Sequence, residues 1–183
     1  MTTQLRDELV AHSQWVYGRL HNRIADLSDD EYLWEPVPGC WNIRRREDGA
    51  LKPDGIDPLP DQWPDPAPVT TIAWRLAHII DIVGQERNAT WLGLEPVLAD
   101  DFTAEPTAAG AIARLVRANA VWEGYLGAID DAVLWQNVGP VGGFYADYTR
   151  CAFVLHEIDE LIHHGAEVAL LRDLHQAGSG DKR

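Results

Sequence analysis

The sequence has little cysteine, little positive charge and no long apolar run. Its two cysteines, Cys40 and Cys151, form no C-x-x-C pair, and no signal-peptide-like segment begins the chain, so we expect a reducing, cytoplasmic compartment. No stretch reaches the roughly 18 uncharged apolar residues that a membrane span requires. Basic residues number 15 against 29 acidic ones, and the formal net charge of −14 is the wrong sign for binding nucleic-acid phosphates. We therefore expect neither a nucleic acid nor a membrane as a partner.

The sequence is rich instead in amphipathic helical patterning. Apolar residues recur at intervals of three and four, as on one face of a helix, over about 2–27, 71–92, 106–129 and 147–174. No segment shows the convincing period-two alternation of a strand. Because the apolar stripes of four helices must be buried against one another, the sequence predicts an all-α four-helix bundle. We expect one domain over residues 1–175, followed by a polar, frayed tail over 176–183.

Capping residues support these helix boundaries. Ser28 and Glu31 form an S-x-x-E capping pattern that begins a short piece after the first long helix. Thr70 or Thr71 caps the second long helix, and Gly93 ends it.

A long loop, residues 39–68, separates the first two long helices and resists regular structure. It holds six prolines and several Asp-Gly or Asp-Pro pairs, and it contains Trp41 and Trp63. Loops of this length are usually either functional or disordered. Because tryptophan is costly to leave in water, we favour an ordered loop that covers a pocket. The alternative is a simple surface excursion.

The last helix carries an unusual density of metal-binding side chains over residues 155–167. His156, Glu160 and His164 are spaced by four residues and so form a ladder along one side of the helix. His78, on the second long helix, lies on a largely apolar stripe. If the two helices face each other, His78, Glu160 and His164 supply two imidazoles and one carboxylate to a divalent cation. Three protein ligands leave room on the ion for water or substrate.

These residues also have a purely structural interpretation. The main apolar arc of the last helix passes through Val154, Ile158, Leu161, Gly165 and Ala169. Glu160 and His164 lie off this arc, so they also suit a solvated polar face with intrahelical pairs. His78 taken alone also suits a hydrogen-bonded core histidine.

Three further histidines are candidates for supporting roles. His12, on the seam of the first helix, is either a core histidine or an outer partner of the metal ligands. His156 and His163 are alternative ligands, although His163 points about 100° away from His164 on a helical wheel. The H-E-x-x-H motif of zinc metalloproteases and the paired E-x-x-H motifs of di-iron bundles are absent from the sequence. The G-x-S-x-G, P-loop and G-x-G-x-x-G motifs are absent too.

Together these features resemble the DinB-like superfamily, over nearly the whole chain. The resemblance is carried by the order of four helices and by three segments: P-G-C-W at 38–41, W-R-L-A-H-I at 74–79 and E-L-I-H-H-G-A-E at 160–167. It is nearest to the branch of the mycothiol-dependent maleylpyruvate isomerase metal domain and related thiol S-transferases. Many DinB-like proteins use three histidines, whereas Glu160 stands here where one would fall; the isomerase branch also uses E-x-x-x-H. The resemblance therefore implies His78, Glu160 and His164 as ligands.

The resemblance also implies a chemistry. A divalent metal, zinc first with nickel, manganese or iron as alternatives, would bind a low-molecular-weight thiol and stabilise its thiolate for attack on a small electrophile. A cation lowers the pKa of a bound thiol, so no dedicated base is required. Mycothiol is the thiol expected first, and bacillithiol or glutathione would serve the same chemistry. Cys40 is interpreted as a packing residue, with a nucleophilic role as the alternative.

Residues near His78 or in loops are candidates for the thiol pocket. We expect Arg44 and Arg75 to anchor the polar body of the thiol, and Trp41, Trp74 and Tyr145 to form pocket walls. A second hypothesis, from another class, is a non-catalytic metal-binding or ligand-binding stress or interaction protein, since a fold does not fix a function. A homodimer formed through helix faces is compatible with either hypothesis.

Overall fold

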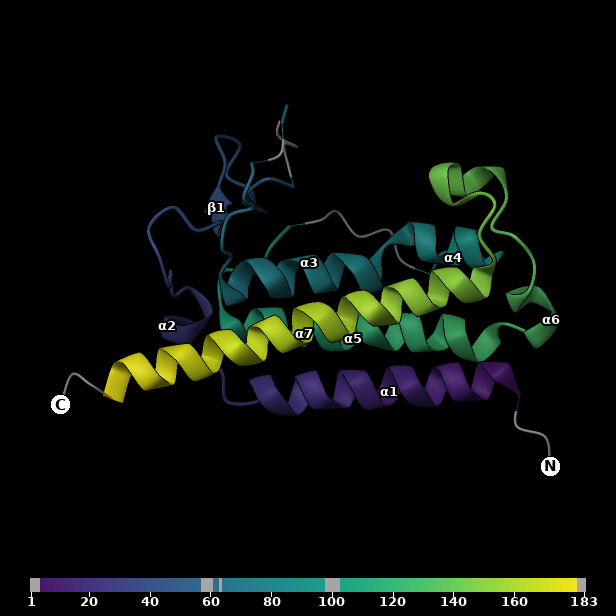
Figure 1. The fold of residues 1–183 in the computed structure, drawn as a ribbon, viewed down its shortest axis with the longest axis horizontal. Helices are drawn as coiled ribbons and strands as arrows, with labels where there is room; N and C mark the ends of the chain where they lie inside the picture. Colours follow the sequence, from purple (N-terminus) through teal and green to yellow (C-terminus); the bar gives the residue numbers. More distant parts are fainter. Residues whose placement is uncertain (1–3, 57–60, 63, 98–102, 181–183) are drawn as a thin grey trace.

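The structure, a computed structural model, describes residues 4–56, 61–62, 64–97 and 103–180. It confirms the predicted all-α architecture, with four long helices side by side in an elongated bundle (Figure 1). The long helices are α1 (Leu5–Ile24), α3 (Ile72–Gly84), α5 (Ala108–Ala128) and α7 (Arg150–Gly180). The shorter elements are α2 (Asp29–Tyr32), β1 (Ile43–Arg45), β2 (Leu51–Pro53), α4 (Glu86–Leu92), α6 (Asp131–Leu134) and the 3-10 helix η1 (Pro140–Tyr145). Within the described ranges, no helix is both long and apolar enough to cross a membrane.

Helix α7 is buried on two sides, which a single apolar arc did not predict. Both α1 and α3 pack on α5 and on α7. On the side toward α1, Gly165 of the predicted arc approaches Leu20. Phe153, Glu157 and His164 lie off that arc but are also buried, against α3, α4 and α5. The polar side of α7 therefore packs against other helices and is only partly open to solvent.

Helix ends follow the predicted capping residues. Ser28 and Glu31 form the complete capping box at the start of α2. The Thr71 hydroxyl accepts a hydrogen bond from the Trp74 main-chain N–H, which caps α3. Gly93 adopts φ of 76°, as expected for the left-handed residue that ends α4.

The second predicted helix is two helices rather than one continuous helix over 71–92. Between α3 and α4, Gln85 has an extended backbone, with φ of −62° and ψ of 136°. The buried Asn88 side chain donates a 2.7 Å hydrogen bond to the carbonyl of Ile82, which the break leaves without its helical partner. The break also re-aims α4, which brings Arg87 against α7.

The loop over 39–68 contains regular structure that the sequence analysis missed. Strands β1 and β2 pair as an antiparallel hairpin, so the expectation of no strand was wrong. Three-residue strands are too short to show period-two alternation, but the Asp-Gly pair ending at Gly49, with φ of 86°, is a hairpin signal. The main chain of Trp41 pairs with the segment just before α3, which ties the loop to the bundle. Trp63 lies outside the described residues.

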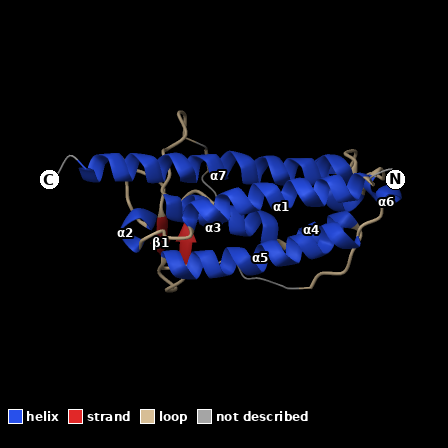
Figure 2. Cartoon of the chain, turned by 90° about the horizontal axis from the view of Figure 1, so that it is seen from below, coloured by secondary structure: helices blue, strands red, loops and turns tan. Residues whose placement is uncertain are grey.

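The two ends of the bundle carry different elements. The hairpin and α2 lie beside the C-terminal half of α7, whereas α4, α6 and η1 lie toward its start (Figures 1 and 2). At the first end, the buried Arg172 guanidinium pairs with Glu31 at 3.1 Å and with Asp26 at 2.8 Å. Helix α7 continues to Gly180, so residues 176–180, which were expected to fray, are helical.

Candidate metal centre

Helices α3 and α7 bring the three predicted ligands together. Oε2 of Glu160 lies 3.1 Å from Nε2 of His164 and 3.8 Å from Nε2 of His78. The two imidazole rings have centroids 4.7 Å apart and are inclined by 71°. One donor atom from each residue lies within 4.8 Å of the other two. Small side-chain adjustments would let one ion contact all three.

His78 has the protonation state that a ligand needs. Burial, with smaller contributions from His164 and Arg75, lowers the pKa of His78 to about 4 against the opposing effect of Glu160. The imidazole is therefore neutral near neutral pH. Its Nδ1 is buried and has no hydrogen-bond partner among the described residues. A core histidine held by hydrogen bonds would use that nitrogen, so the structure does not support the hydrogen-bonded-core interpretation of His78.

His164 is oriented from its far side by Glu167, which the sequence analysis did not single out. Nδ1 of His164 lies 2.7 Å from Oε2 of Glu167. In the metal-bound protein Nε2 would face the ion, so Nδ1 would carry the proton and donate it to Glu167. Nε2 would then present its lone pair toward Glu160 and the ion. Carboxylate–histidine pairs of this kind commonly orient metal-binding imidazoles, and the i,i+3 spacing was the available signal.

Arg75 supplies the counter-charge to this carboxylate. Its Nε lies 2.9 Å from Oε2 of Glu167 as an ion pair. Burial raises the pKa of Glu167, but the hydrogen bond with His164 and the charge of Arg75 outweigh it, so that the net pKa is lowered. Glu167 is therefore an anion that shares a hydrogen bond with His164 and forms an ion pair with Arg75.

The donor set fits a divalent cation of the zinc type. Nε2 of His164 lies 3.1 Å from a Glu160 oxygen, so a cation held between them would contact both donors. Two neutral imidazoles and one carboxylate are ligands that zinc accepts, and a fourth position would stay open. His78, Glu160 and His164 are thus the residues that would hold the ion.

A further buried carboxylate lies next to the ligands. Glu157, one turn before Glu160, is 1% exposed, and its Oε1 lies 3.2 Å from Nη2 of Arg87 on α4. Burial raises the pKa of Glu157 to about 7, although Arg87 opposes the rise. The sequence analysis missed this pair because the chain changes direction at Gln85, and only this change brings Arg87 next to α7.

Two of the predicted pocket walls stand beside the ligands. The ring of Trp74 lies 5.2 Å from that of His78 and 6.0 Å from that of Trp41. The indole N–H of Trp74 donates a 2.7 Å hydrogen bond to the main-chain carbonyl of Asp54, which fixes the ring against the hairpin. Arg75 lies on the same stretch of α3, with its guanidinium 4.9 Å from the Trp74 ring. These residues form the hairpin side of the centre.

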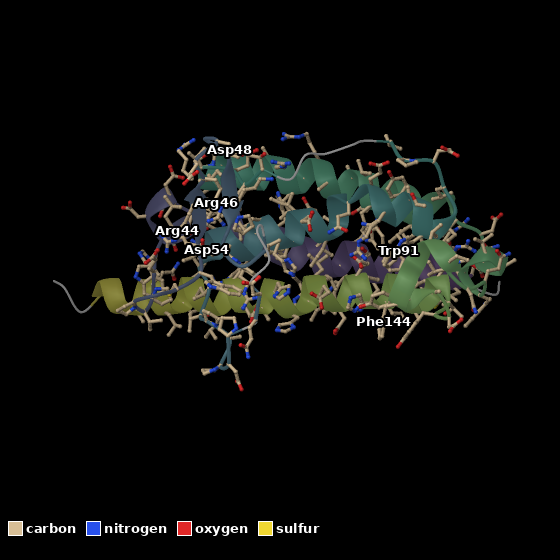
Figure 3. The ribbon with its side chains drawn as sticks, turned by 90° about the horizontal axis from the view of Figure 1, so that it is seen from above. Arg44, Arg46, Asp48, Asp54, Trp91 and Phe144 are labelled. Carbon is tan, nitrogen blue, oxygen red and sulfur yellow. The ribbon has the colours of Figure 1, made fainter. Side chains whose placement is uncertain are left out.

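The predicted anchor Arg44 lies farther out, on β1. Its Nε is 2.8 Å from Asp54 and its Nη2 is 3.0 Å from Glu35, while its side chain is 48% exposed. Figure 3 shows Arg44, Arg46 and Asp54 grouped at the hairpin end, away from Trp91. Arg44 therefore forms ion pairs with Glu35 and Asp54 and is partly exposed to solvent.

Three other predicted residues lie elsewhere. Tyr145, on η1, has its ring 5.5 Å from Trp91 and 5.8 Å from His156, near the start of α7. His156 is one turn before Glu160 but does not belong to the three-residue donor group. His12 is exposed on α1 and stacks on Trp15 at 6.2 Å, so it is neither a core histidine nor a neighbour of the centre.

His163 belongs to a second donor group that overlaps the first. It is 60% exposed, and its ring stacks on that of His164 with centroids 4.6 Å apart. Donor atoms of His163, His164 and Glu167 lie within 4.8 Å of one another. His163 is not part of the group of His78, Glu160 and His164, and it meets His164 only beside Glu167.

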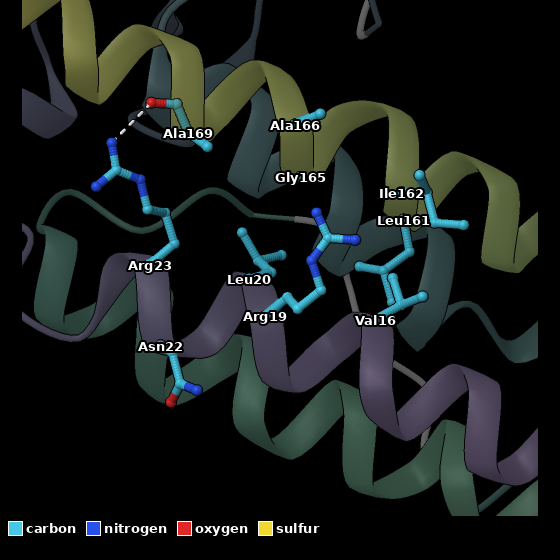
Figure 4. A pocket seen from close by; sticks show the side chains of 10 residues that line it. All are labelled: Val16, Arg19, Leu20, Asn22, Arg23, Leu161, Ile162, Gly165, Ala166 and Ala169. Atoms are coloured by element: carbon cyan, nitrogen blue, oxygen red, sulfur yellow. Dashed lines mark hydrogen bonds between the residues drawn. The ribbon is translucent and has the colours of Figure 1, made fainter.

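A groove of about 470 Å³ lies on the other side of α7, between α7 and α1 (Figure 4). Its floor is apolar, with Leu20 and Gly165, and Arg19 and Arg23 border it. Because His164 faces α3, this groove is separate from the metal centre.

Comparisons with known proteins agree with the fold. A sequence model for the family described as the DinB superfamily matches residues 56–168, a range that contains His78, Glu160 and His164. A solved structure, described as the crystal structure of the conserved protein of locus from Enterococcus faecalis, is 14% identical with a TM-score of 0.58. The alignment covers 94% of this chain and 98% of that one, and it shows a shared fold. No curated protein sequence matches.

Proposed function

This chain belongs to the DinB superfamily, and we propose that it is a divalent-metal-dependent transferase or isomerase that activates a low-molecular-weight thiol for attack on a small electrophile. The observation that carries the proposal is the convergence of His78, Glu160 and His164, with Nδ1 of His164 committed to Glu167. Three-ligand sets that leave a position open are typical of reactive rather than structural metal sites. Zinc suits these donors best, with nickel, manganese or iron as alternatives.

A bound ion would lower the pKa of a thiol that contacts it, which makes thiolate available at neutral pH without a dedicated base. The residues of the chain prepare that contact. His78 is neutral near neutral pH and offers a lone pair, His164 would offer Nε2 to the ion, and Glu160 would supply the single negative charge of the ligand set. A divalent ion held by these three residues keeps a net positive charge, which favours an anionic sulfur over a neutral one.

The surroundings of the ligands suit a polar thiol with an extended body. Trp74, fixed by its bond to the hairpin, covers one side of His78 and limits the access of water there. Trp41 continues this wall outward. Arg44, half exposed beyond it, offers guanidinium donors to polar groups of the thiol. We propose mycothiol first, with bacillithiol and glutathione as alternatives.

Metal analysis of purified protein tests the ligand set. We expect about one zinc per chain in the wild type and its loss in both Glu160→Ala and His164→Ala. Asp159→Ala removes an exposed carboxylate next to Glu160 and should keep the ion, so it controls for general effects on α7. Circular dichroism verifies that each variant is folded. Folded wild-type protein that cannot be loaded with zinc, cobalt or nickel would refute the ligand assignment.

Cobalt-substituted protein tests the thiol step. Addition of mycothiol, bacillithiol or glutathione should produce a sulfur-to-cobalt charge-transfer band, strongest for the preferred thiol. Trp74→Ala should weaken the affinity for that thiol while the metal content stays unchanged. A bound ion whose spectrum is insensitive to all three thiols would instead favour the non-catalytic binding protein.

A further inference from the structure

The two overlapping donor groups use opposite nitrogens of His164. Toward Glu160 and His78 the imidazole presents Nε2, at 3.1 Å from the Glu160 carboxylate. Toward Glu167 it presents Nδ1, at 2.7 Å. Nε2 of His163 lies 3.5 Å from the other oxygen of Glu167. The second group, His163, His164 and Glu167, therefore has the same composition as the first: two imidazoles and one carboxylate.

A guanidinium already lies within the second group. Nη1 of Arg75 is 3.1 Å from Nδ1 of His164, and Nε of Arg75 is 2.9 Å from Glu167. The Arg75 side chain is 16% exposed, so water screens its charge only partly. A guanidinium stays protonated in proteins, and its charge at this distance repels a divalent cation that approaches Nδ1. The Arg75 charge also acts on His78 and Glu160, on the Nε2 side, but among the described residues no guanidinium or ammonium group forms an ion pair with Glu160.

We infer that His163, His164 and Glu167 form a second, latent site for a nitrogen-preferring divalent cation such as zinc, cobalt or copper, and that Arg75 keeps this site closed. Arg75 thereby makes the centre mononuclear and directs the ion to the Nε2 side of His164. The second site does not require the thiol chemistry proposed above. When a neutral residue replaces Arg75, a second ion takes the place of the Nδ1 proton of His164, and that proton leaves to solvent. Glu167 then becomes a ligand of the ion instead of a hydrogen-bond acceptor.

Arg75→Met tests the inference, because methionine has a similar length and no charge. With excess zinc followed by gel filtration, we expect one ion per chain in the wild type and two in Arg75→Met. The double variant Arg75→Met/His163→Ala should return to one ion. Arg75→Lys keeps a positive charge at the same place and should also bind one ion, and His163→Ala alone should match the wild type. Arg75→Gln serves as a second neutral variant if Arg75→Met does not fold.

Each outcome decides between the two sites. A folded neutral variant that binds no more zinc than the wild type overturns the inference, and so does a second ion that survives in the double variant. If the wild type binds no ion but Arg75→Met binds one that needs His163, the latent site stands and the proposed first site fails. If Glu160→Ala removes the wild-type ion while Arg75→Met gains none, the first site stands and the latent site fails.

Discussion

Replacing Glu157 by glutamine should stabilise the metal-free protein above neutral pH. The Glu157 side chain is 1% exposed, and its Oε2 has no hydrogen-bond partner among the residues that the structure describes. Oε1 lies 3.2 Å from Arg87, which offsets only part of the cost of burial. Glutamine keeps the shape of the side chain and an oxygen for Arg87 but cannot ionise, so it removes the buried charge and little else.

The size of the effect follows from the pKa of Glu157. Burial raises this pKa from the usual 4.5 to about 7. The folded chain therefore binds the proton more tightly than the unfolded chain, by about 3 kcal/mol at 1.36 kcal/mol per pH unit. Because the pKa is higher in the folded state, this stability is complete below about pH 4.5 and is lost as the pH rises through about 7. The wild type should lose it by pH 8, and Glu157→Gln should not.

Urea unfolding of chelator-treated protein at pH 5 and pH 8 measures the difference. The free energy of unfolding of Glu157→Gln, relative to the wild type, should rise by about 2 to 3 kcal/mol between the two pH values. Glu86→Gln, at an exposed position on α4, is the matched control and should show no such change. A difference between Glu157→Gln and the wild type that is equal at both pH values would refute the reasoning.

Two further substitutions test the hairpin end of the bundle. Arg172→Met should cost about 3 to 5 kcal/mol in urea unfolding, because it leaves the buried Glu31 carboxylate without its cation; exposed Arg117→Met should cost almost nothing. A loss below 1 kcal/mol would contradict the first expectation. Gly55→Ala should displace Trp41, since an added Cβ would lie 2.3 Å from its ring and φ at this position is +70°. Gly55→Ala should lower the free energy of unfolding by about 1 to 3 kcal/mol and change the near-ultraviolet circular dichroism spectrum. An unchanged spectrum would count against the packing of Trp41 on Gly55.

The fold was predictable where short-range signals decide it. Caps at Ser28 and Thr71 and the terminator Gly93 act through neighbouring residues, so the sequence alone reveals them. The break at Gln85 was not predictable, because it depends on the buried Asn88 capturing a carbonyl in the folded state. The hairpin had a local signal in its Asp-Gly turn, which the surrounding prolines obscured.

The convergence of the three candidate ligands could be predicted from the sequence, whereas the residues that support them could not. Their spacing places Glu160 and His164 on one side of the last helix. How far they are buried depends on the packing of α7 against both α1 and α3. A helical wheel describes one helix and contains no information about this packing. Glu167 was detectable from its i,i+3 spacing to His164. The contact between Arg87 and Glu157 crosses from α4 to α7, and no local pattern encodes it.

The charges around the α3–α7 seam connect the pH dependence of Glu157 to the metal centre. The charged side chains there are the carboxylates of Asp81, Glu157, Glu160 and Glu167 and the guanidinium groups of Arg75 and Arg87. With Glu157 ionised, the carboxylates exceed the guanidinium groups by two charges, and Asp81 and Glu160 both raise the pKa of Glu157. A divalent ion on Glu160 would cancel that excess, which favours the ionised form of Glu157. Zinc loading should therefore reduce the pH-dependent advantage of Glu157→Gln, and loading that leaves this advantage unchanged would mean that the ion binds away from the seam.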